Sequence, residues 1–230
     1  TLDGVLFRKK DDALVAYPRG KAASSYTVPQ GTSAVGERAF DSCSFLTSIS
    51  LPASVTEIDD YAFSDCSALV EVSIPSSVDE IGSCAFNYCT ALSSIVIPDS
   101  VTEIEEGAFA ECRALTTVVL PNSLTEISDY LFSDCTSLSD ILIPASVTEI
   151  ETGAFQRCTA LVSIVIPDSV TEIEDIAFFE CSALRSVLLP ASVTEIGVGA
   201  FDKCPNLTLT VFRNSYAERY AQRNHIPYTY

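Results

Sequence analysis

Proline recurs at every twenty-third position through most of this 230-residue chain. The series comprises Pro29, Pro52, Pro75, Pro98, Pro121, Pro144, Pro167 and Pro190. Phenylalanines from Phe40 to Phe201 and eight cysteines from Cys43 to Cys204 keep the same period. A strict period of this length is typical of a solenoid, in which each unit is too small to bury its own apolar face and must stack on its neighbours. We therefore look for function on a surface built by repetition rather than in a single pocket.

One unit, residues 69–91, predicts the local structure of all the others. Val72 and Ile74 lie two positions apart and share one face of a short strand, which Pro75 ends because proline has no amide proton to donate. An extended segment of the pattern Val-x-Glu-Ile follows. Apolar spacings of three and four then favour a turn or two of tight helix, at Ala85, Phe86, Cys89 and Leu92. Since equal units stack by translation, their strands should lie parallel and in register, about 4.7–4.9 Å apart.

The repeats resemble the leucine-rich repeats, and among these the BspA-type class with units of 23 residues. The residues that carry the resemblance have the form Leu46-x-x-Ile49-x-Leu51-Pro52-x-Ser54-Val55-x-x-Ile58-x-x-x-Ala62-Phe63-x-x-Cys66. The pattern covers about eight units, from Pro29 to Phe212. It is weakened in the first unit, in the last unit and at one central position, by Thr32, Val35, Pro205, Thr210 and Leu131.

The resemblance implies an α/β fold, a right-handed leucine-rich-repeat horseshoe with a parallel sheet on its concave side and short helical turns on its convex side. It also implies a bacterial or protist cell-surface protein that binds other proteins, often as an adhesin. Since the chain starts at Thr1 and has no methionine, we interpret it as a trimmed piece of a longer precursor. We expect an extracellular or cell-surface location, with any export signal or anchor outside this segment.

The two ends are expected to cap a single structural domain. Residues 29–212 hold the eight repeats. Residues 1–28 are predicted to form a hairpin that covers the open edge of the first strand. Residues 213–230 are predicted to form a short helix and a strand, because Ser215 and Glu218 have the spacing of a capping box.

The net charge of −18 is concentrated in the repeats. Between Asp41 and Leu184 the only basic residues are Arg113 and Arg157. An anionic body repels phosphate backbones and anionic lipid surfaces, so we expect no nucleic acid partner and no direct membrane insertion. No apolar run approaches the ~18 residues of a membrane span. Solubility is a sufficient reason for charge of this sign and size.

The nine cysteines are predicted to be free thiols. No pair has the C-x-x-C spacing of a zinc or redox site. Cysteines stacked in register lie about 4.8 Å apart with parallel side chains, whereas a disulfide needs Cβ atoms that face each other at about 3.8 Å. The eight periodic cysteines are therefore interpreted as small buried hydrophobic side chains, and Cys84 as an additional thiol outside the series.

Carboxylates offer the main alternative chemistry. A glutamate recurs in each extended segment, at Glu57, Glu80, Glu103, Glu126, Glu149, Glu172 and Glu195. Calcium could bridge such a ladder, but no calcium-loop motif accompanies it, and we predict no metal and no cofactor. His225 is the only histidine, and no nucleophile motif or phosphate-binding glycine loop occurs. An enzyme is not expected.

Two columns of side chains are predicted to face outward from the concave sheet. The first is small and polar and comprises Ser25, Ser48, Glu71, Ser94, Thr117, Asp140, Ser163 and Ser186. The second begins with Thr27, Ser50 and Ser73 and then turns apolar, with Val96, Val119, Leu142, Val165, Leu188 and Val211. Parallel sheets are normally covered, and large exposed apolar patches tend to be interaction sites. The alternative is that Val and Leu simply favour strands and stack on each other.

We predict a protein-binding module whose ligand is a protein or peptide, such as a host surface or matrix protein. The predicted contact residues are Val96, Val119, Leu142, Val165, Leu188 and Val211, with Glu71, Thr117 and Asp140 beside them. Glu71 and Asp140 favour a basic partner. A homodimer through the same apolar residues is the alternative assembly. The alternative functions are a structural spacer and a carbohydrate-directed module within a larger secreted protein, although the columns lack the aromatic platforms that sugars usually need.

Overall fold

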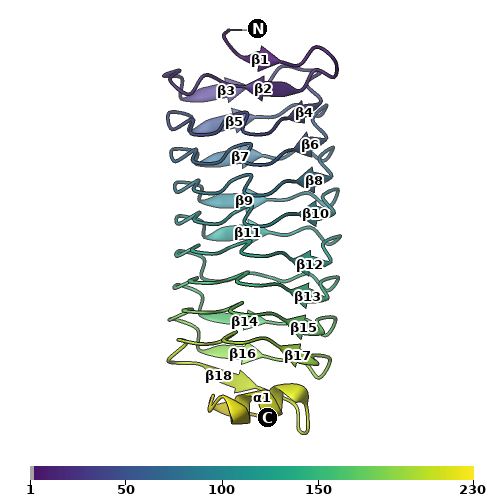
Figure 1. Cartoon of the computed structure of the whole chain (residues 1–230), viewed down its shortest axis with the longest axis vertical. Coiled ribbons are helices and arrows are strands. Elements are labelled where there is room, and N and C mark those ends of the chain that lie inside the picture. The colour runs from purple at the N-terminus through teal and green to yellow at the C-terminus, as the bar shows by residue number, and fades with distance from the viewer. Residues whose placement is uncertain (1–2) are drawn as a thin grey trace.

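The computed structural model describes residues 3–230. Its repeats stack one upon another as about nine turns of a solenoid, with the two termini at opposite ends of the column (Figure 1). Most turns contribute a short strand to each of two parallel ladders, both interrupted along their length, which run down different sides of the column in Figure 1. The predicted parallel-strand solenoid is confirmed, whereas the curvature of a horseshoe stays a prediction.

The first ladder holds the strands that were predicted before each proline. Its strands are β3 (Ser25–Thr27), β5 (Ser48–Ser50), β7 (Glu71–Ser73), β9 (Ser94–Val96), β11 (Thr117–Val119), β14 (Ser163–Val165), β16 (Ser186–Leu188) and β18 (Thr208–Thr210). Hydrogen-bonded neighbours are parallel and in register, so that Ser48 pairs with Glu71 one unit later. From β5 to β18 the middle residue of each strand is buried, while the two flanking residues face solvent wholly or in part. We call this solvent-facing side, predicted above as the concave face, the strand face.

The second ladder consists of two-residue strands in the Val-x-Glu-Ile segments. They are β4 (Ala34–Val35), β6 (Glu57–Ile58), β8 (Glu80–Ile81), β10 (Glu103–Ile104), β12 (Glu126–Ile127), β13 (Glu149–Ile150), β15 (Glu172–Ile173) and β17 (Glu195–Ile196). From β6 to β17 the isoleucine of each strand is buried and the glutamate faces outward. The predicted extended segments therefore form a glutamate ladder on the outside of the stack.

The return segment of each unit differs from the expected turn of tight helix. In the unit that contains Phe63, the backbone is left-handed at Tyr61 (φ 54°) and at Asp65 (φ 55°), and both positions recur with positive φ in the following units. As a result, successive backbone amides alternate between hydrogen bonds within the unit and hydrogen bonds to the next unit. Ala62 donates to Asp59 of its own unit, whereas Phe63 donates to the carbonyl of Ala85 in the next unit. These inter-unit bonds hold successive turns together where a helix would have satisfied only itself.

Ile176 occupies one of these left-handed positions at φ 50°, where the equivalent residues include Gly107, Gly153 and Gly199. A β-branched side chain is strained there, since Cβ approaches the following carbonyl. We expect Ile176→Gly to raise the free energy of unfolding by about 0.5–1 kcal/mol, the strain relief exceeding the added entropy of the unfolded glycine. Urea unfolding measures the change, and Gly153→Ile should show the opposite sign. A loss of stability in Ile176→Gly would contradict the inference that the backbone at Ile176 is strained.

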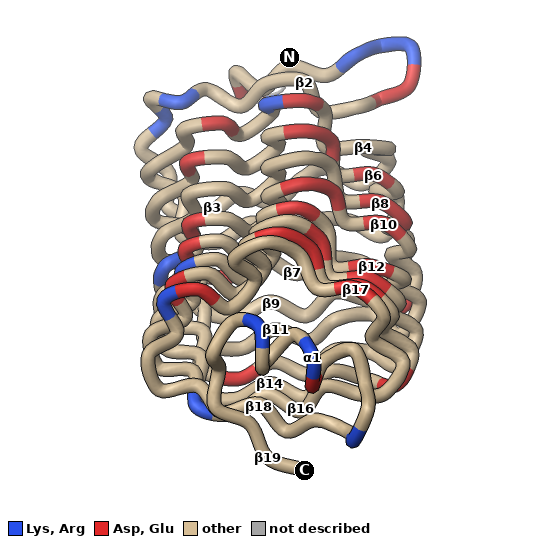
Figure 2. Tube along the Cα trace, turned by 60° about the horizontal axis from the view of Figure 1, so that its bottom comes forward, with Lys and Arg blue, Asp and Glu red and all other residues tan. Residues whose placement is uncertain are grey.

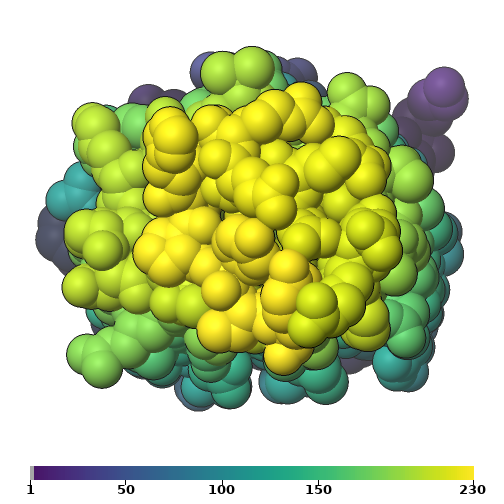
Figure 3. All heavy atoms as spheres, turned by 90° about the horizontal axis from the view of Figure 1, so that it is seen from below, coloured from purple at the N-terminus to yellow at the C-terminus, as the bar shows by residue number. Residues whose placement is uncertain are grey.

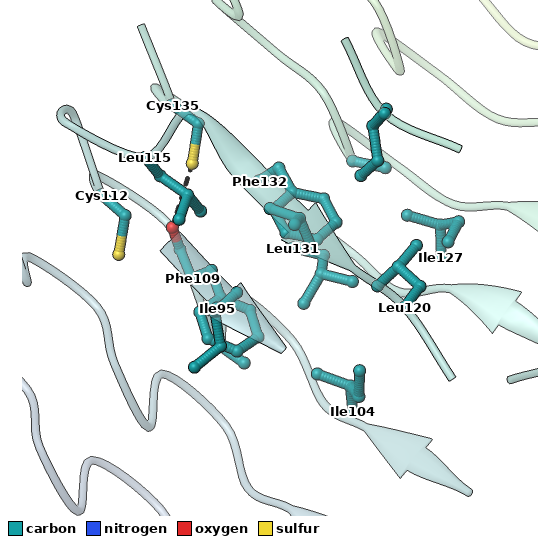
Figure 4. Packing of buried hydrophobic residues seen from close by; sticks show 14 of the residues in the cluster. Ile95, Ile104, Phe109, Cys112, Leu115, Leu120, Ile127, Leu131, Phe132 and Cys135 are labelled. Carbon is teal, nitrogen blue, oxygen red and sulfur yellow. Dashed lines mark hydrogen bonds between the residues drawn. The ribbon is translucent and has the colours of Figure 1, made fainter. Parts of the chain in front are cut away.

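The core is a bundle of side-chain columns that run along the stack. The seven phenylalanine pairs from Phe40 to Phe201 have ring centroids 5.0–5.9 Å apart and rings within 17° of parallel. Figure 4 shows Phe109 and Phe132 in successive units, with the thiol of Cys135 directed at the carbonyl of Phe109. Serine hydroxyls after the prolines donate to carbonyls of the preceding unit at 2.5–2.8 Å, for example Ser77 to Val55. These five serines therefore have a structural role between units, whereas the hydroxyls of Ser100 and Ser192 at the same position have no hydrogen-bond partner among the described residues.

All nine cysteines lie within the described residues and are free thiols, as predicted. Seven of the periodic thiols donate to the carbonyl oxygen of a phenylalanine one unit back, at Sγ–O distances of 3.1–3.2 Å. Burial raises the pKa of these thiols, to about 11 at Cys204 and further in the middle of the stack, where Cys112 is fully enclosed.

Native thiol labelling should therefore reach two cysteines at most. Cys84 and Cys204 are partly exposed, and the other seven are buried thiols that stay protonated and inaccessible. We expect an alkylating reagent at pH 8 to modify no more than these two in the folded protein and all nine in denaturant, as counted by intact mass. Rapid native labelling of Cys89 or Cys135 would contradict the burial, and fewer than nine labels in denaturant would contradict the free thiols.

The stack loosens in its middle, around Leu131. This leucine stands in a column whose equivalents are alanines, such as Ala108 and Ala154, and the adjacent ring pair Phe109–Phe132 has the widest centroid spacing, 5.9 Å. Both ladders are interrupted here, since β10 does not pair with β12, and residues 140–142 form no strand. The larger side chain in the column of alanines thus lies where both ladders are interrupted, while the first ladder has a further interruption between β7 and β9.

Both ends are closed by side chains that continue the core. β1 (Leu6–Phe7) and β2 (Leu14–Ala16) pair antiparallel, and β2 continues the second ladder through β4. At the other end, α1 (Tyr216–Arg223) and β19 (Tyr228–Thr229) lie across the last turn, and their atoms cover most of the end view in Figure 3. Ser215 accepts the amide of Glu218 at 3.1 Å and starts the helix. One buried apolar cluster extends from Val5 to Ala221. The division into two caps and one repeat domain stays a prediction.

Candidate protein-binding face

The strand face exposes a row of large aliphatic side chains, one per unit. Val96 and Val165 are each 62% exposed, Val119 48%, Leu142 81% and Leu188 38%. The residues on either side of each in the chain are buried because successive strand side chains point to opposite faces. We call these five residues the aliphatic column.

Val211 does not belong to the column, although the sequence predicted it there. It is 2% exposed and lies in the core, while Thr210 pairs with Leu188. The reason is a missing residue in the last unit: Leu207 and Leu209 lie two positions apart, where three separate Leu184 and Val187. Every side chain after the deletion is therefore shifted to the opposite face.

Two prolines border the aliphatic column. Pro98 and Pro167 are partly exposed and lie two residues after Val96 and Val165, and Pro98 lines a depression of 300 Å³ together with Val96 and Glu71. The equivalent prolines of the other three units, Pro121, Pro144 and Pro190, are buried. Sequence reasoning treated the prolines only as strand ends. We call the aliphatic column together with Pro98 and Pro167 the apolar stripe.

The face changes character towards the N-terminal end of the stack. A depression of 360 Å³ lies over β3, β5 and β7, lined by the polar side chains Ser25, Thr27, Ser48, Ser50, Glu71 and Ser73 and by Tyr26, Ile49 and Val72. This hydroxyl-rich hollow overlaps the Val96–Pro98 depression at Glu71 and Ser73. The strand face thus consists of a polar part that continues into the apolar stripe.

Acidic side chains flank the apolar stripe. Asp140 is exposed in the polar column next to Leu142, and Glu71 is exposed two units from Thr117 on the same column. On the other side, Asp99 and Asp168 are exposed directly after Pro98 and Pro167. The predicted contact residues Glu71, Thr117 and Asp140 therefore lie beside the stripe. Asp99 and Asp168 were not among the predicted residues, because they lie after the strands and outside the alternating pattern.

A larger acidic band follows the second ladder, well separated from the stripe, and the red segments of Figure 2 trace it over β6, β8, β10, β12 and β17. Several of its carboxylates have structural partners at the adjacent bend. Glu105 accepts the amide of Ser83, and Glu174 accepts the amide of Thr152, each at 3.0 Å. Part of the acidity therefore satisfies backbone groups between units, in addition to keeping the surface charged.

Within this band the carboxylate oxygens of Glu149, Glu172 and Glu174 lie within 4.8 Å of one another. Burial and then the neighbouring glutamates raise the pKa of Glu149 and of Glu172. Burial raises the pKa of Glu151 to about 7, with Glu126 adding to the effect. Burial and the neighbouring carboxylates thus raise the pKa of three glutamates in this band.

We expect the raised pKa of Glu151 to make the free energy of unfolding depend on pH. The folded protein keeps the Glu151 proton up to about pH 7, whereas an unfolded glutamate loses it near 4.5, so stability falls as the pH rises between these values. Glu151→Gln should therefore be more stable than wild type at pH 8, by at most about 1 kcal/mol because solvent screens this partly exposed group. Urea midpoints at pH 4.5 and pH 8 test this, since the difference should vanish at the lower pH. An equal difference at both values would contradict the assignment.

No helix in residues 3–230 has the length and apolar character needed to cross a bilayer. Glutamates of the acidic band and the side chains of the aliphatic column are exposed wholly or in part. What the strand face offers chemically is hydrophobic contact with carboxylates and hydroxyls at its margins, which suits recognition of another molecule.

Comparison with known proteins agrees with the repeat geometry. The model of the BspA type leucine rich repeat region matches residues 19–139 and 79–208, in six copies. A search of the curated proteins finds no match. A crystal structure of a leucine-rich repeat protein from Bacteroides ovatus is 30% identical over 90% of this chain, with a TM-score of 0.71, and this chain spans 61% of its length.

Two further structures are similar. A leucine rich cell surface protein from Faecalibacterium prausnitzii is 30% identical with a TM-score of 0.65, over 92% of this chain and 76% of that one. A T. pallidum leucine-rich repeat protein is 28% identical with a TM-score of 0.63, over 98% of this chain and 94% of that one. The family match covers most of the repeats and confirms the predicted resemblance. The chain therefore belongs to the BspA-type leucine-rich repeat proteins.

Proposed function

We propose that this protein is a cell-surface protein-binding module of the adhesin type, and that it binds its partner on the strand face. The observation that carries the proposal is the exposed aliphatic column, in which Leu142 is 81% exposed and which none of the described residues covers. Leaving such a row in water is unfavourable by about 25 cal/mol per Å² of apolar area, which a partner would recover by covering it. A relative with cell surface in its name, from Faecalibacterium prausnitzii, supports the location.

The family and the electrostatics support a protein as the ligand. The acids that flank the stripe favour a partner with basic residues at its margins. A sugar is disfavoured because the apolar stripe contains no aromatic residue, although Tyr26 lines the polar hollow beside it. The structural-spacer alternative leaves the exposed column without a role.

The test is a surface variant with a matched control. Val119→Asp plus Val165→Asp places two charges in the aliphatic column without touching the core, because both side chains are exposed. The control, Ser182→Asp plus Val198→Asp, adds the same charge at exposed positions away from the strand face. Each variant is first shown by circular dichroism and urea unfolding to be folded as wild type is.

Cell-surface extracts are then captured on wild type and on both variants, and captured proteins are tested singly for direct binding. We expect the control variant to bind as wild type does and the stripe variant to bind at least tenfold more weakly. Equal binding by wild type and both variants would refute the proposal that the partner binds on the strand face. Capture of no binding protein by wild type would favour the spacer.

A further inference from the structure

The first ladder begins with an open strand edge at the N-terminal end of the stack. The hairpin of β1 and β2 closes the second ladder, because β2 pairs with β4, and Tyr17 continues the column of phenylalanine rings by stacking on Phe40 at 5.2 Å. This first turn has no counterpart in the first ladder. There β3 pairs with β5 and with no other strand of residues 3–230.

The outer edge of β3 carries free hydrogen-bonding groups. The carbonyl of Ser24 accepts an amide of the next unit at 2.7 Å, and the amide of Val28 donates to that unit at 3.0 Å. The backbone groups of a strand alternate in direction, so those of Ser25 and Thr27 point away from β5. Both residues are exposed, and none of the described residues bonds their backbone groups at this edge. Such a row of unpaired groups is a template for another strand.

β3 also lacks the features that usually protect an edge strand. Charged side chains, prolines and bulges normally prevent further pairing. Ser25–Thr27 is neutral, contains no proline and is in register with β5. Its middle residue, Tyr26, packs against the core but is only half-buried, whereas Ile49 and Val72, which follow it in the same column, are buried. A further strand would therefore cover the exposed part of the Tyr26 ring.

The charge beside this edge favours an acidic occupant. Lys21 Nζ lies 5.9 Å from the centroid of the Tyr26 ring and bonds the carbonyl of Asp3 at 3.0 Å rather than a carboxylate. A second copy of this chain would meet repulsion here. Pairing of two β3 strands brings two Lys21 side chains together, and pairing of β3 with β19 brings Lys21 to the end that holds Arg219 and Arg223. A partner strand with a carboxylate near Lys21 has the complementary charge.

We propose that β3 accepts an extended segment of a partner protein as an additional strand, with an apolar side chain over Tyr26 and an acidic side chain beside Lys21. In such strand addition the backbone hydrogen bonds provide affinity and the alternate side chains provide specificity. The side chains that flank the apolar residue would face the same side as the hydroxyl-rich hollow over β3, β5 and β7. The apolar stripe begins only at β9, so this second site is independent of the proposed function.

Two substitutions of one residue isolate the strand edge. Thr27→Pro removes the outward amide and keeps the bonds between β3 and β5, because proline is tolerated in an edge strand where the N–H side faces solvent. Thr27→Val is the matched control, since it keeps the amide and the β-branched shape. Lys21→Gln removes the charge. Circular dichroism and urea unfolding first establish that each variant is folded as wild type is.

The probe is a display library of nine-residue peptides with alternating polar and apolar positions and one acidic residue. It is selected on the wild-type protein with Thr27→Pro as competitor. Enriched peptides are synthesised in two N-methylated forms, which block the amides along one edge of the peptide strand or along the other. Fluorescence anisotropy measures affinity, and NMR measures hydrogen exchange at the amides of Ser25 and Thr27 with and without peptide.

We expect affinity to fall at least tenfold with Thr27→Pro, to stay unchanged with Thr27→Val and to weaken with Lys21→Gln. Only one of the two N-methylated forms should lose binding, and exchange at Ser25 and Thr27 should slow when the peptide binds. No enrichment above Thr27→Pro, equal loss in both methylated forms, or unchanged exchange at these two amides would overturn strand addition. Full affinity for Lys21→Gln would overturn the acidic partner. Self-association of wild type that Thr27→Pro abolishes, seen by sedimentation, would overturn the partner protein in favour of a second copy.

Discussion

Phe109→Ala should lower the free energy of unfolding by about 3–5 kcal/mol, the range expected when a buried phenylalanine is truncated in a packed core. Phe109 has no exposed surface, and its ring stacks on Phe86 at 5.3 Å and on Phe132 at 5.9 Å. The alanine leaves a cavity in the ring column beside the already loosened contact with the unit of Leu131. Urea unfolding followed by circular dichroism measures the loss.

The matched control lies at the end of the column. Phe201→Ala removes the same side chain where the ring stacks on Phe178 on one side and meets Tyr220 edge-on on the other. In a solenoid the terminal unit has one repeat neighbour, so we expect a smaller loss, and a fraying end instead of a broken array. Equal losses of unfolding free energy at the two sites, or a loss below 1 kcal/mol at Phe109, would mean that stacking of the phenylalanine rings does not stabilise the repeats.

Gly197→Ala is expected to cost about 1–3 kcal/mol through overpacking. A Cβ on Gly197 would clash with the amide nitrogen of Asp175 in the preceding unit, which is a backbone atom and cannot turn aside as a flexible side chain could. The melting temperature, measured by calorimetry, should fall by several degrees. Gly20→Ala is the control, because a Cβ there has no atom within 4 Å, and it should cost nothing. A fully tolerated Gly197→Ala would contradict the close stacking of the last two repeats.

The architecture could be predicted because it depends on periodicity. Pro52, Phe63 and Cys66 recur at equal spacing, and translation is the one operation that buries every copy equally. The left-handed positions were harder to find, because Tyr61, Cys84 and Ile176 occupy conformations that usually belong to glycine. The signal was the glycine that fills the same position in other units. The wider spacing near Leu131 depends on how neighbouring side chains pack, and the spacing of residues in the sequence contains no information about that packing.

The candidate face was predictable in part for the same reason. Strand alternation placed Val96, Val119 and Leu142 outward, and their exposure agrees. The position of Val211 was wrong because one missing residue after Leu207 reverses the alternation, and extending an unbroken period across the last unit concealed it. Binding on the strand face depends on a second molecule as well as on this chain. The sequence pattern can therefore suggest a binding face but cannot establish it.

Methyl NMR of the strand face tests the central claim most directly. In a protein labelled at Val and Leu methyl groups, titration with a partner captured from extracts reports contact residue by residue. The account predicts shifts at Val96, Val119, Leu142, Val165 and Leu188, with Val198 on the opposite bend unchanged. Shifts that leave these five signals in place and appear at Val198 or in the terminal segments would show that the protein binds through another surface.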